Sequence, residues 1–389
     1  VELAWRVRAR RPDGDHAPWL TLTGTNGKTT TVGMLTEILR AAGRDAVAVG
    51  NVGTPIVRVA AGGGADVLAV ELSSFQLHST WTVAPQASAC LNLAPDHLDW
   101  HGSFAAYRAD KARVYARTEV ACVYNEADPA TRVMVEEADV AEGARAVGTT
   151  LRVPAVGQLG LVEDVLVDRA MHAQRHTAAA ELGTLADLAH LTPTGSAELV
   201  PDHVVANALA AAALALAHGV APEHVRAGLR AYAPGAHRIA PVGTRGGVRY
   251  VDDSKATNAH AAAASLGVVP AGTCVWLAGG LTKGASVDEL VAAHRDRLRA
   301  VVLIGTDRAP LREALARHAP EVPLFEVPPG EDGQVMPRAV AQAARAARPG
   351  DTVLLAPAAA SMDQFADYAD RGDAFARAVA ALAEEEGHR

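Results

Sequence analysis

The segment LTLTGTNGKTT, residues 20–30, combines the residue types of a phosphate-binding loop. Gly24 and Gly27 allow a sharp backbone turn that brings N–H groups close to phosphate oxygens. Lys28 can place its charge on the outer phosphates of a nucleotide, and the hydroxyl of Thr29 can bind Mg²⁺. The segment therefore predicts nucleotide phosphate binding.

The spacing of this segment departs from the common P-loop. That pattern has a glycine five residues before the second glycine, and this chain has Leu22 there. A helix is expected directly after the loop, over about residues 29–42, because apolar residues recur on one face. The bound phosphates would then lie at the positive end of a helix.

Four more polar residues lie near strand ends or on a helix of the first half. Glu71 closes an apolar run, as a Mg²⁺ ligand beside nucleotide phosphates would, and the alternative is an acid at a helix start. Asn51 follows the run AVAVG, and His97 follows ACLNL between two aspartates. His97 alone could be a structural hydrogen-bonding residue, and Lys111 could be a solvated helix lysine.

A second set of polar residues lies in the C-terminal half. They belong to the segments HR and DDSKATN: Arg238, Asp253, Lys255, Thr257 and Asn258. An arginine and an aspartate could hold the γ-phosphate and the ribose hydroxyls of ATP. Lys283 and Ser361 could bind a carboxylate substrate, although by default they are a loop lysine and a helix N-cap.

Alternating strands and helices position these residues. The expected strands of the first half span 19–23, 46–50, 67–72, 87–93, 120–124 and 145–148, with a helix over 104–118. Their near-continuous apolar runs favour a parallel sheet that is buried on both faces. GLVEDVLVDRA (160–170) predicts an antiparallel hairpin, and helices are expected over 202–218 and 222–232. A second α/β pattern begins near residue 235.

Composition excludes several classes of protein. The chain has 389 residues, 49% hydrophobic and 21% charged, which predicts a globular protein with more than one domain. A net charge of −8 without a basic stripe argues against nucleic-acid binding. The three cysteines are expected to be buried free thiols, and no apolar run approaches the ~18 residues of a membrane span. We expect a cytoplasmic monomer with no membrane partner.

Together these motifs resemble the Mur ligase family, in particular its D-glutamate-adding member, over essentially the whole chain. GTNGKTT is shared by Mur ligases and folylpolyglutamate synthetases. The motifs similar to the D-glutamate-adding member are ELSSFQL (71–77), NLAPDHLDWHGSFAAYRADK (92–111), DDSKATN (252–258) and APAAASMDQFADYADRGDAF (356–375).

The resemblance implies a fold, a reaction and cofactors. The fold is α/β, with residues 1–18 a remnant or linker, a central P-loop-type parallel-sheet ATPase domain (19–234) and a Rossmann-like C-terminal domain (235–389). The reaction is ATP-dependent ligation of D-glutamate to UDP-N-acetylmuramoyl-L-alanine through an acyl phosphate, in peptidoglycan precursor synthesis. Two Mg²⁺ ions would assist, and Lys111 would carry a CO₂-derived carbamate.

The resemblance also implies a role for each matching residue. The catalytic residues are Lys28, His97 and Lys111. ATP is bound by Gly24, Thr25, Asn26, Gly27, Lys28, Thr29, Thr30, Asn207, Arg238 and Asp253. The metal ligands are Thr29, Glu71, His97 and carbamylated Lys111. The substrates are bound by Asn51, Ser73, His97, Lys255, Thr257, Lys283, Ser361 and Tyr368.

Two departures from the family pattern affect these expectations. Val204 stands where relatives often have asparagine, so the adenine site depends more on Asn207. The family has an N-terminal domain for the uridine diphosphate end, and residues 1–18 are too short to encode it. We therefore expect intact ATP and D-glutamate sites, a lost UDP anchor and sharply reduced turnover.

Three other functions stay open at this point. The first is another amide ligase of the Mur type or the folylpolyglutamate type. The motifs ELSSFQL and SMDQF favour a D-glutamate-adding ligase over these. The second is an ATPase that drives motion or assembly, which would leave Lys283 and Ser361 without a role. The third is an inactive fragment or binding protein, although the phosphate loop and its candidate partners are intact.

Overall fold

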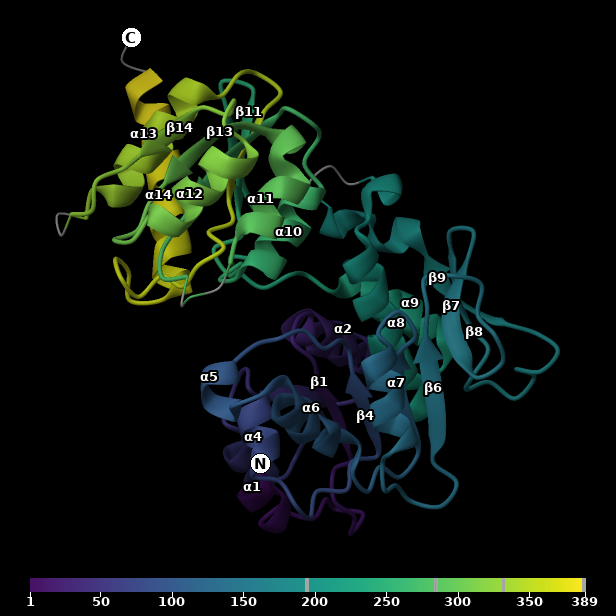
Figure 1. The fold of residues 1–389 in the computed structure, drawn as a ribbon. Coiled ribbons are helices and arrows are strands. Elements are labelled where there is room, and N and C mark those ends of the chain that lie inside the picture. Colours follow the sequence, from purple (N-terminus) through teal and green to yellow (C-terminus); the bar gives the residue numbers. More distant parts are fainter. Residues whose placement is uncertain (193–195, 283, 285, 331–332, 387–389) are drawn as a thin grey trace. The chain divides into compact units, whose positions relative to one another are not determined.

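The computed structural model describes residues 1–192, 196–282, 284, 286–330 and 333–386. The chain divides into two compact units, Val1–Ala233 and Pro234–Arg389. Each unit has its own sheet with helices on both faces (Figure 1). No helix in the described ranges is long and apolar enough to cross a membrane.

Unit 1 is built on a nine-stranded sheet with the order β2-β3-β1-β4-β5-β6-β7-β8-β9. Strands β2 to β7 pair in parallel, whereas β8 is antiparallel to both β7 and β9, which confirms the hairpin expected over 160–170. The strands are β1 Trp19–Thr23, β2 Ala46–Gly50, β3 Val67–Glu71, β4 Ala87–Cys90, β5 Ala121–Asn125, β6 Arg145–Thr149, β7 Gln158–Val162, β8 Val165–Asp168 and β9 Ala180–Thr184.

Nine α-helices are described in unit 1. They are α1 Glu2–Arg6, α2 Lys28–Ala41, α3 Ile56–Gly62, α4 Ser74–His78, α5 Leu98–His101, α6 Phe104–Ala112, α7 Pro129–Glu136, α8 Asp202–Ala217 and α9 Pro222–Ala231. Short 3₁₀ segments span Arg113–Tyr115, Leu185–Leu191 and Ala197–Leu199. The helix expected over 104–118 is therefore shorter, because α6 tightens into a 3₁₀ turn and Arg117 adopts a φ of 57°.

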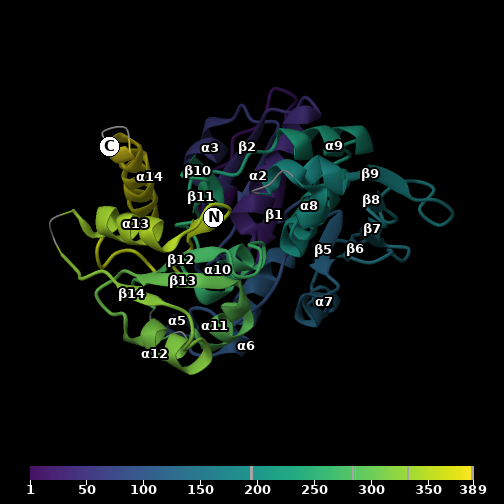
Figure 2. The ribbon, with the colours of Figure 1, turned by 90° about the horizontal axis from the view of Figure 1, so that it is seen from above.

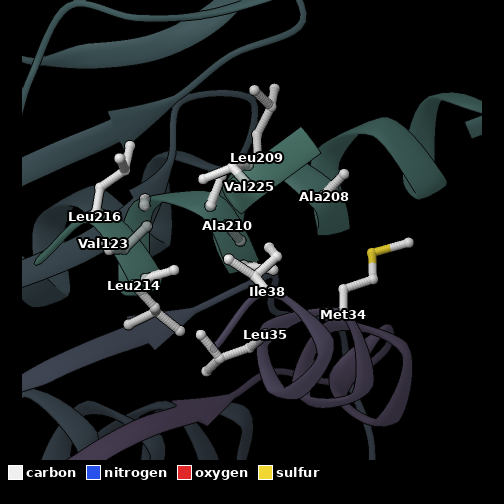
Figure 3. Close-up of a cluster of buried hydrophobic side chains, with 14 of the residues drawn as sticks. Met34, Leu35, Ile38, Val123, Ala208, Leu209, Ala210, Leu214, Leu216 and Val225 are labelled. Atoms are coloured by element: carbon white, nitrogen blue, oxygen red, sulfur yellow. The ribbon is translucent and has the colours of Figure 1, made fainter. Parts of the chain in front are cut away.

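The main core of unit 1 lies between the sheet and helices α2, α8 and α9. Figure 3 shows Leu35 and Ile38 of α2 among the alanine and leucine side chains of α8. Helix α8 is buried almost all round, and its small alanines let neighbouring elements approach closely. This packing anchors the N-terminal end of α2, where the phosphate loop lies.

The strand order of unit 1 predicts where a ligand binds. The connection after β1 runs to β2 on one side of β1, whereas the connection after β3 crosses to β4 on the other side. Open α/β sheets bind ligands at the carboxyl ends of the strands at such a switch point. Gly24 follows β1, Glu71 ends β3 and Asn92 lies just beyond β4, so all three are at this point.

The N-terminal residues fold onto unit 1. Helix α1 packs against α3, and Ala4 is buried. The ring of Trp5 meets the ring of Trp19 edge-on, with 5.0 Å between their centroids. Glu2 accepts hydrogen bonds from the backbone N–H groups of Trp81 and Thr82.

Unit 2 is a six-stranded sheet with the order β10-β11-β15-β12-β13-β14, parallel except for the edge strand β10. Helices α10, α11 and α12 cover one face, and α13 and α14 cover the other (Figure 2). The strands are β10 Ala240–Arg245, β11 Val248–Asp252, β12 Cys274–Ala278, β13 Leu298–Leu303, β14 Leu324–Glu326 and β15 Thr352–Leu355. The helices are α10 Ala259–Gly267, α11 Asp288–His294, α12 Ala309–His318, α13 Val335–Ala346 and α14 Tyr368–Glu386, with a 3₁₀ turn over Arg295–Arg297. The α/β fold class expected from the sequence is confirmed in both units.

Candidate active site

The phosphate loop between β1 and α2 is held by the segment that leaves β4. The N–H of Thr25 donates to the carbonyl of Asn92 at 3.0 Å, and the N–H of Asn26 donates to Asn92 Oδ1 at 2.8 Å. Lys28 folds back over the loop, where its Nζ donates to the carbonyls of Gly24 (2.8 Å) and Thr25 (2.9 Å). These hydrogen bonds from neighbouring segments and from Lys28 hold the loop in its turn.

Gly27 is the residue on which the loop depends most. It precedes α2 with a φ of 80°, and a Cβ there would lie 2.4 Å from Oδ1 of Asn207 on α8. The structure therefore brings Asn207 next to the loop. Among the described residues no side chain caps α2, so the positive end of this helix faces the loop, with Thr29 and Thr30 in its first turn.

Glu71 lies at the end of β3 with an incomplete set of hydrogen bonds. Its carboxylate is buried, and Oε1 accepts from Nδ2 of Asn51 at 2.9 Å. Oε2 is also buried and has no hydrogen-bond partner among the described residues. A buried carboxylate oxygen without a donor is costly, so this atom is suited to a cation.

Lys111 is buried rather than solvated, so its interpretation as a surface helix lysine is wrong. Its Nζ donates to the carbonyl of Gly24 at 2.8 Å and to Oγ1 of Thr23 at 3.2 Å. Burial, together with the nearby charge of Lys28, lowers the pKa of Lys111 from 10.5 to about 7. Much of this lysine is therefore an uncharged, nucleophilic amine at neutral pH.

Lys28, Lys111 and Asn51, the partner of Glu71, line one cavity of about 140 Å³. Its lining residues are Lys28, Asn51, Ser73, Ser74, Phe75, Asp96, His97, Tyr107 and Lys111. His97 precedes α5 with a φ of 51°, its side chain is half-exposed, and its ring lies edge-on to Phe75 at 4.9 Å. The three residues predicted from the sequence to be catalytic, Lys28, His97 and Lys111, therefore line the same cavity.

A second cavity of about 210 Å³ lies beside Asn207. It is lined by β4, β5 and the start of α8, and apolar side chains such as Leu91 and Leu151 dominate its walls. Asn125 and His203 add polar groups. A mostly apolar cavity with a few polar groups, next to a phosphate loop, is suited to a flat heteroaromatic base.

In unit 2, the buried Arg371 ties together two segments that carry predicted substrate residues. Its Nε donates to Oγ of Ser254 (2.9 Å), Nη2 to the carbonyl of Ser254 (2.8 Å) and Nη1 to the carbonyl of Ala359 (3.1 Å). Lys255 lies with its Nζ 5.0 Å from the ring centroid of Tyr368. Arg371 thereby holds the segments of Lys255 and Ser361 side by side.

Other predicted residues of unit 2 are placed as follows. Asp253 is buried, accepts from the hydroxyl of Ser265 and from the N–H of Ile239, and has a pKa that burial raises to about 6. Ser361 is buried, and its carbonyl accepts from the N–H groups of residues 364 and 365. Thr257 lies before α10, and Arg238 lies in the segment that leads to β10. Lys283 lies outside the described residues.

Sequence reasoning missed several residues of these sites. Tyr107 bonds to Oγ1 of Thr25 at 2.9 Å, and Asn92 anchors the loop. A signal for Asn92 existed, since it directly follows a strand beside the phosphate loop. Arg371 left no signal, because only burial distinguishes it from a surface arginine. Ser73 has a structural role, since its hydroxyl accepts from the N–H of Gln76 and caps α4.

Comparison with known families finds two matches along the chain. Residues 22–215 match the Mur ligase middle domain, and residues 237–359 match the Mur ligase, glutamate ligase domain. The first match contains the phosphate loop, Glu71, His97 and Lys111, and the second contains Arg238 to Ala359.

Curated relatives are similar over nearly the whole chain. The UDP-N-acetylmuramoylalanine–D-glutamate ligase of Streptomyces avermitilis is 57% identical over 383 residues, covering 98% of this chain and 79% of the relative. The protein of the same name from Thermobifida fusca is 58% identical over 387 residues, with the same coverage.

Solved structures show the same fold at low sequence identity. MurF ligase from Thermotoga maritima in complex with ADP aligns with a TM-score of 0.61 at 17% identity, over 94% of this chain and 81% of that one. Folylpolyglutamate synthase of Mycobacterium tuberculosis, complexed with ADP and AMPPCP, aligns with a TM-score of 0.63 at 16% identity, over 94% and 91%. At this identity the likeness concerns the fold alone.

Proposed function

This chain belongs to the Mur ligase family, and we propose that it ligates D-glutamate to UDP-N-acetylmuramoyl-L-alanine at the expense of ATP. One observation carries the assignment of the active site. A lysine with a pKa of about 7, a buried carboxylate oxygen with no hydrogen-bond partner in the described part of the chain, and a phosphate loop meet at one sheet edge. The identities above 50% to D-glutamate ligases favour this amino acid over those used by other family members.

The nucleotide would lie along the N-terminus of α2. Its phosphates would meet the backbone of residues 24–30 and the charge of Lys28, and the base would enter the cavity beside Asn207. Fold neighbours were solved with ADP, which is consistent with this use of the loop. Arg238 and Asp253 of unit 2 would contribute to ATP recognition.

The described residues fit Mg²⁺, which prefers oxygen ligands. Glu71 offers a buried oxygen to which no described residue donates a hydrogen bond, and Thr29 lies in the first turn of α2. His97 and a carbamate on Lys111 would hold a second ion. When bound, Mg²⁺ would offset the charge of the phosphates and of the substrate carboxylate.

Lys111 fits a carbamate because only an uncharged amine attacks CO₂. Its lowered pKa supplies that form at neutral pH, and the cavity at its Nζ provides room. The modification would replace a cation with an anion among metal ligands. The hydrogen bonds to Thr23 and Gly24 keep the nitrogen directed at the loop.

The acid substrate would place its carboxylate in the cavity near Lys28, Asn51 and His97. The carboxylate attacks the γ-phosphorus, ADP leaves, and an acyl phosphate forms. The amine of D-glutamate then attacks the carbonyl carbon and loses a proton, and phosphate leaves. Lys255, Thr257, Lys283, Ser361 and Tyr368 would bind D-glutamate. Arg371 holds the segments that carry Lys255 and Ser361.

The test is phosphate release from ATP with UDP-N-acetylmuramoyl-L-alanine present and one amino acid added at a time. We expect release with D-glutamate, together with a product heavier by one glutamyl residue, and none with L-lysine, diaminopimelate or D-alanyl-D-alanine. Release that follows another of these amines would overturn the assignment. We also propose that the protein is a cytoplasmic monomer, which gel filtration and cell fractionation would test.

A further inference from the structure

A buried hydrogen-bonded pair next to the cavity has no role in the reaction described so far. The carboxylate of Asp110, the residue before Lys111, is about 10% exposed and lies 2.9 Å from Nδ1 of His101. The ring of His101 is fully buried, and its Nε2 lies 2.9 Å from Oγ of Ser74. His78 bonds to the other oxygen of the carboxylate at 2.9 Å.

This chain of contacts connects three short helices. Ser74 and His78 belong to α4, His101 ends α5, and Asp110 belongs to α6. The three helices gather on one side of unit 1 (Figure 1), and α6 contacts both α4 and α5. Aromatic contacts complete the cluster, since His101 stacks on Phe75 with ring centroids 5.6 Å apart.

The pair acts on His97 through a single helical turn. Helix α5 has only four residues, and the N–H of His101 donates to the carbonyl of His97 at 3.1 Å. A single turn has little stability of its own, so its position depends on tertiary contacts. The buried ring of His101 is such a contact, and His97 stands at the other end of the same turn.

The same pair acts on Lys111 through α6. Asp110 and Lys111 are neighbours on the helix and point to different partners, Asp110 to α4 and α5 and Lys111 to the phosphate loop. Holding Asp110 against His101 therefore fixes the His97 turn relative to the helix that carries Lys111.

We propose that His101 and Asp110 are positioning residues that hold His97 and Lys111 in the arrangement needed to bind the divalent cation beside the substrate carboxylate. The proposal rests on the function proposed above. Partners behind a metal ligand typically change metal affinity or activity by about 10–100-fold when replaced. Neither residue needs to touch substrate for this effect.

The test compares the full chain with its Asp110→Asn and His101→Phe variants. His101→Phe keeps a ring to stack on Phe75 but removes both nitrogens. Mn²⁺ binding is followed by electron paramagnetic resonance in the presence of AMPPCP, and kcat, the KM for ATP and the Mg²⁺ dependence of turnover are measured. We expect Mn²⁺ affinity and kcat to fall about 10–100-fold, with the KM for ATP within about twofold.

A matched control is Asp187→Asn. Asp187 is another fully buried carboxylate of unit 1, paired with Arg226 and Arg230 of α9, and it does not line the cavity. We expect this variant to lose thermal stability but to keep its Mn²⁺ affinity and kcat. His101→Asn retains a donor near Nδ1 and should recover part of the loss seen in His101→Phe.

Unchanged Mn²⁺ affinity and kcat in Asp110→Asn and His101→Phe would overturn the proposal, and so would equal losses in Asp187→Asn. If Asp110→Asn does not fold, the two His101 variants decide the question. Mn²⁺ binding does not depend on which amino acid is ligated. Failure of the proposed function would instead appear as wild-type turnover that does not follow D-glutamate.

Discussion

Nζ of Lys111 lies 2.8 Å from the carbonyl oxygen of Gly24, so a residue on α6 reaches the first residue of the phosphate loop. This contact places a second lysine beside Lys28. Burial, together with the nearby charge of Lys28, makes the ammonium form of Lys111 less favourable.

Lys111 should make stability rise with pH. Its pKa is about 7 in the folded protein and 10.5 ordinarily, so between these values the unfolded chain binds the extra proton. The free energy of unfolding should therefore increase from about pH 7 to pH 10, by at most about 1.4 kcal/mol per pH unit. Urea unfolding in CO₂-free buffer measures this free energy at each pH. The Lys111→Met variant should not show the increase between pH 7 and pH 10. An identical pH profile in the variant would refute the assignment.

Lys111→Ala should also lose activity. Short free carboxylic acids such as formate should restore part of it, because they can occupy the place of the carbamate. Phosphate release is the assay, and Arg108→Ala, three residues before Lys111 and partly exposed, is a suitable control. Full activity of Lys111→Ala without any added acid would remove this residue from the mechanism.

Gly27→Ala should weaken ATP binding. The substitution puts a Cβ 2.4 Å from Oδ1 of Asn207 at a φ of 80°, so the loop must shift. Gly43→Ala is the matched control, since its φ is 73° and no atom lies within 4 Å of the added Cβ. Both variants should lose about 1 kcal/mol of stability, but only Gly27→Ala should raise the dissociation constant of ATP, by about tenfold or more. Calorimetry distinguishes the two, and equal ATP affinities would contradict the geometry.

Asp253→Asn should make the protein more stable at neutral pH and less active. Burial raises the pKa of Asp253 from 3.8 to about 6, so the folded state binds the extra proton between these values. The ionised carboxylate therefore lowers the free energy of unfolding. This loss grows from about pH 4 to pH 6 and stays constant above pH 6. Thermal unfolding should show a gain for the variant at pH 7.5 that vanishes near pH 4, while the KM for ATP rises. A variant less stable than wild type at pH 7.5 would refute this.

Arg371→Met should weaken D-glutamate binding. The side chain holds Ser254 and the carbonyl of Ala359, and its loss frees the segments of Lys255 and Ser361. We expect the KM for D-glutamate to rise about tenfold or more while the KM for ATP changes little. Arg377→Met is a control on the same helix, because that side chain is 69% exposed. Equal changes in both KM values would show a general loss of structure instead.

Local features of the chain determined most of the fold. Apolar runs such as 67–71 predict buried parallel strands because both faces of the sheet are covered. The two glycines before Lys28 predict the phosphate loop because a positive φ at Gly27 is unfavourable for other residues. Most expected strands lie within a few residues of their predicted bounds. These features depend on near neighbours in sequence and can therefore be deduced without coordinates.

The environments of the functional groups were decided by tertiary structure alone. Nothing near Lys111 in sequence shows that its amine is buried against Gly24, and a solvated helix lysine was the simpler interpretation. Neighbouring sequence likewise does not indicate the hydrogen bond between Asn51 and Glu71 or the contact between His101 and Asp110. It also does not indicate that Arg371 is buried. Desolvation and charge–charge distance set these properties, and both depend on residues far apart in the chain. The sequence alone determined which chemical groups are present, and folding decided their pKa values and their partners.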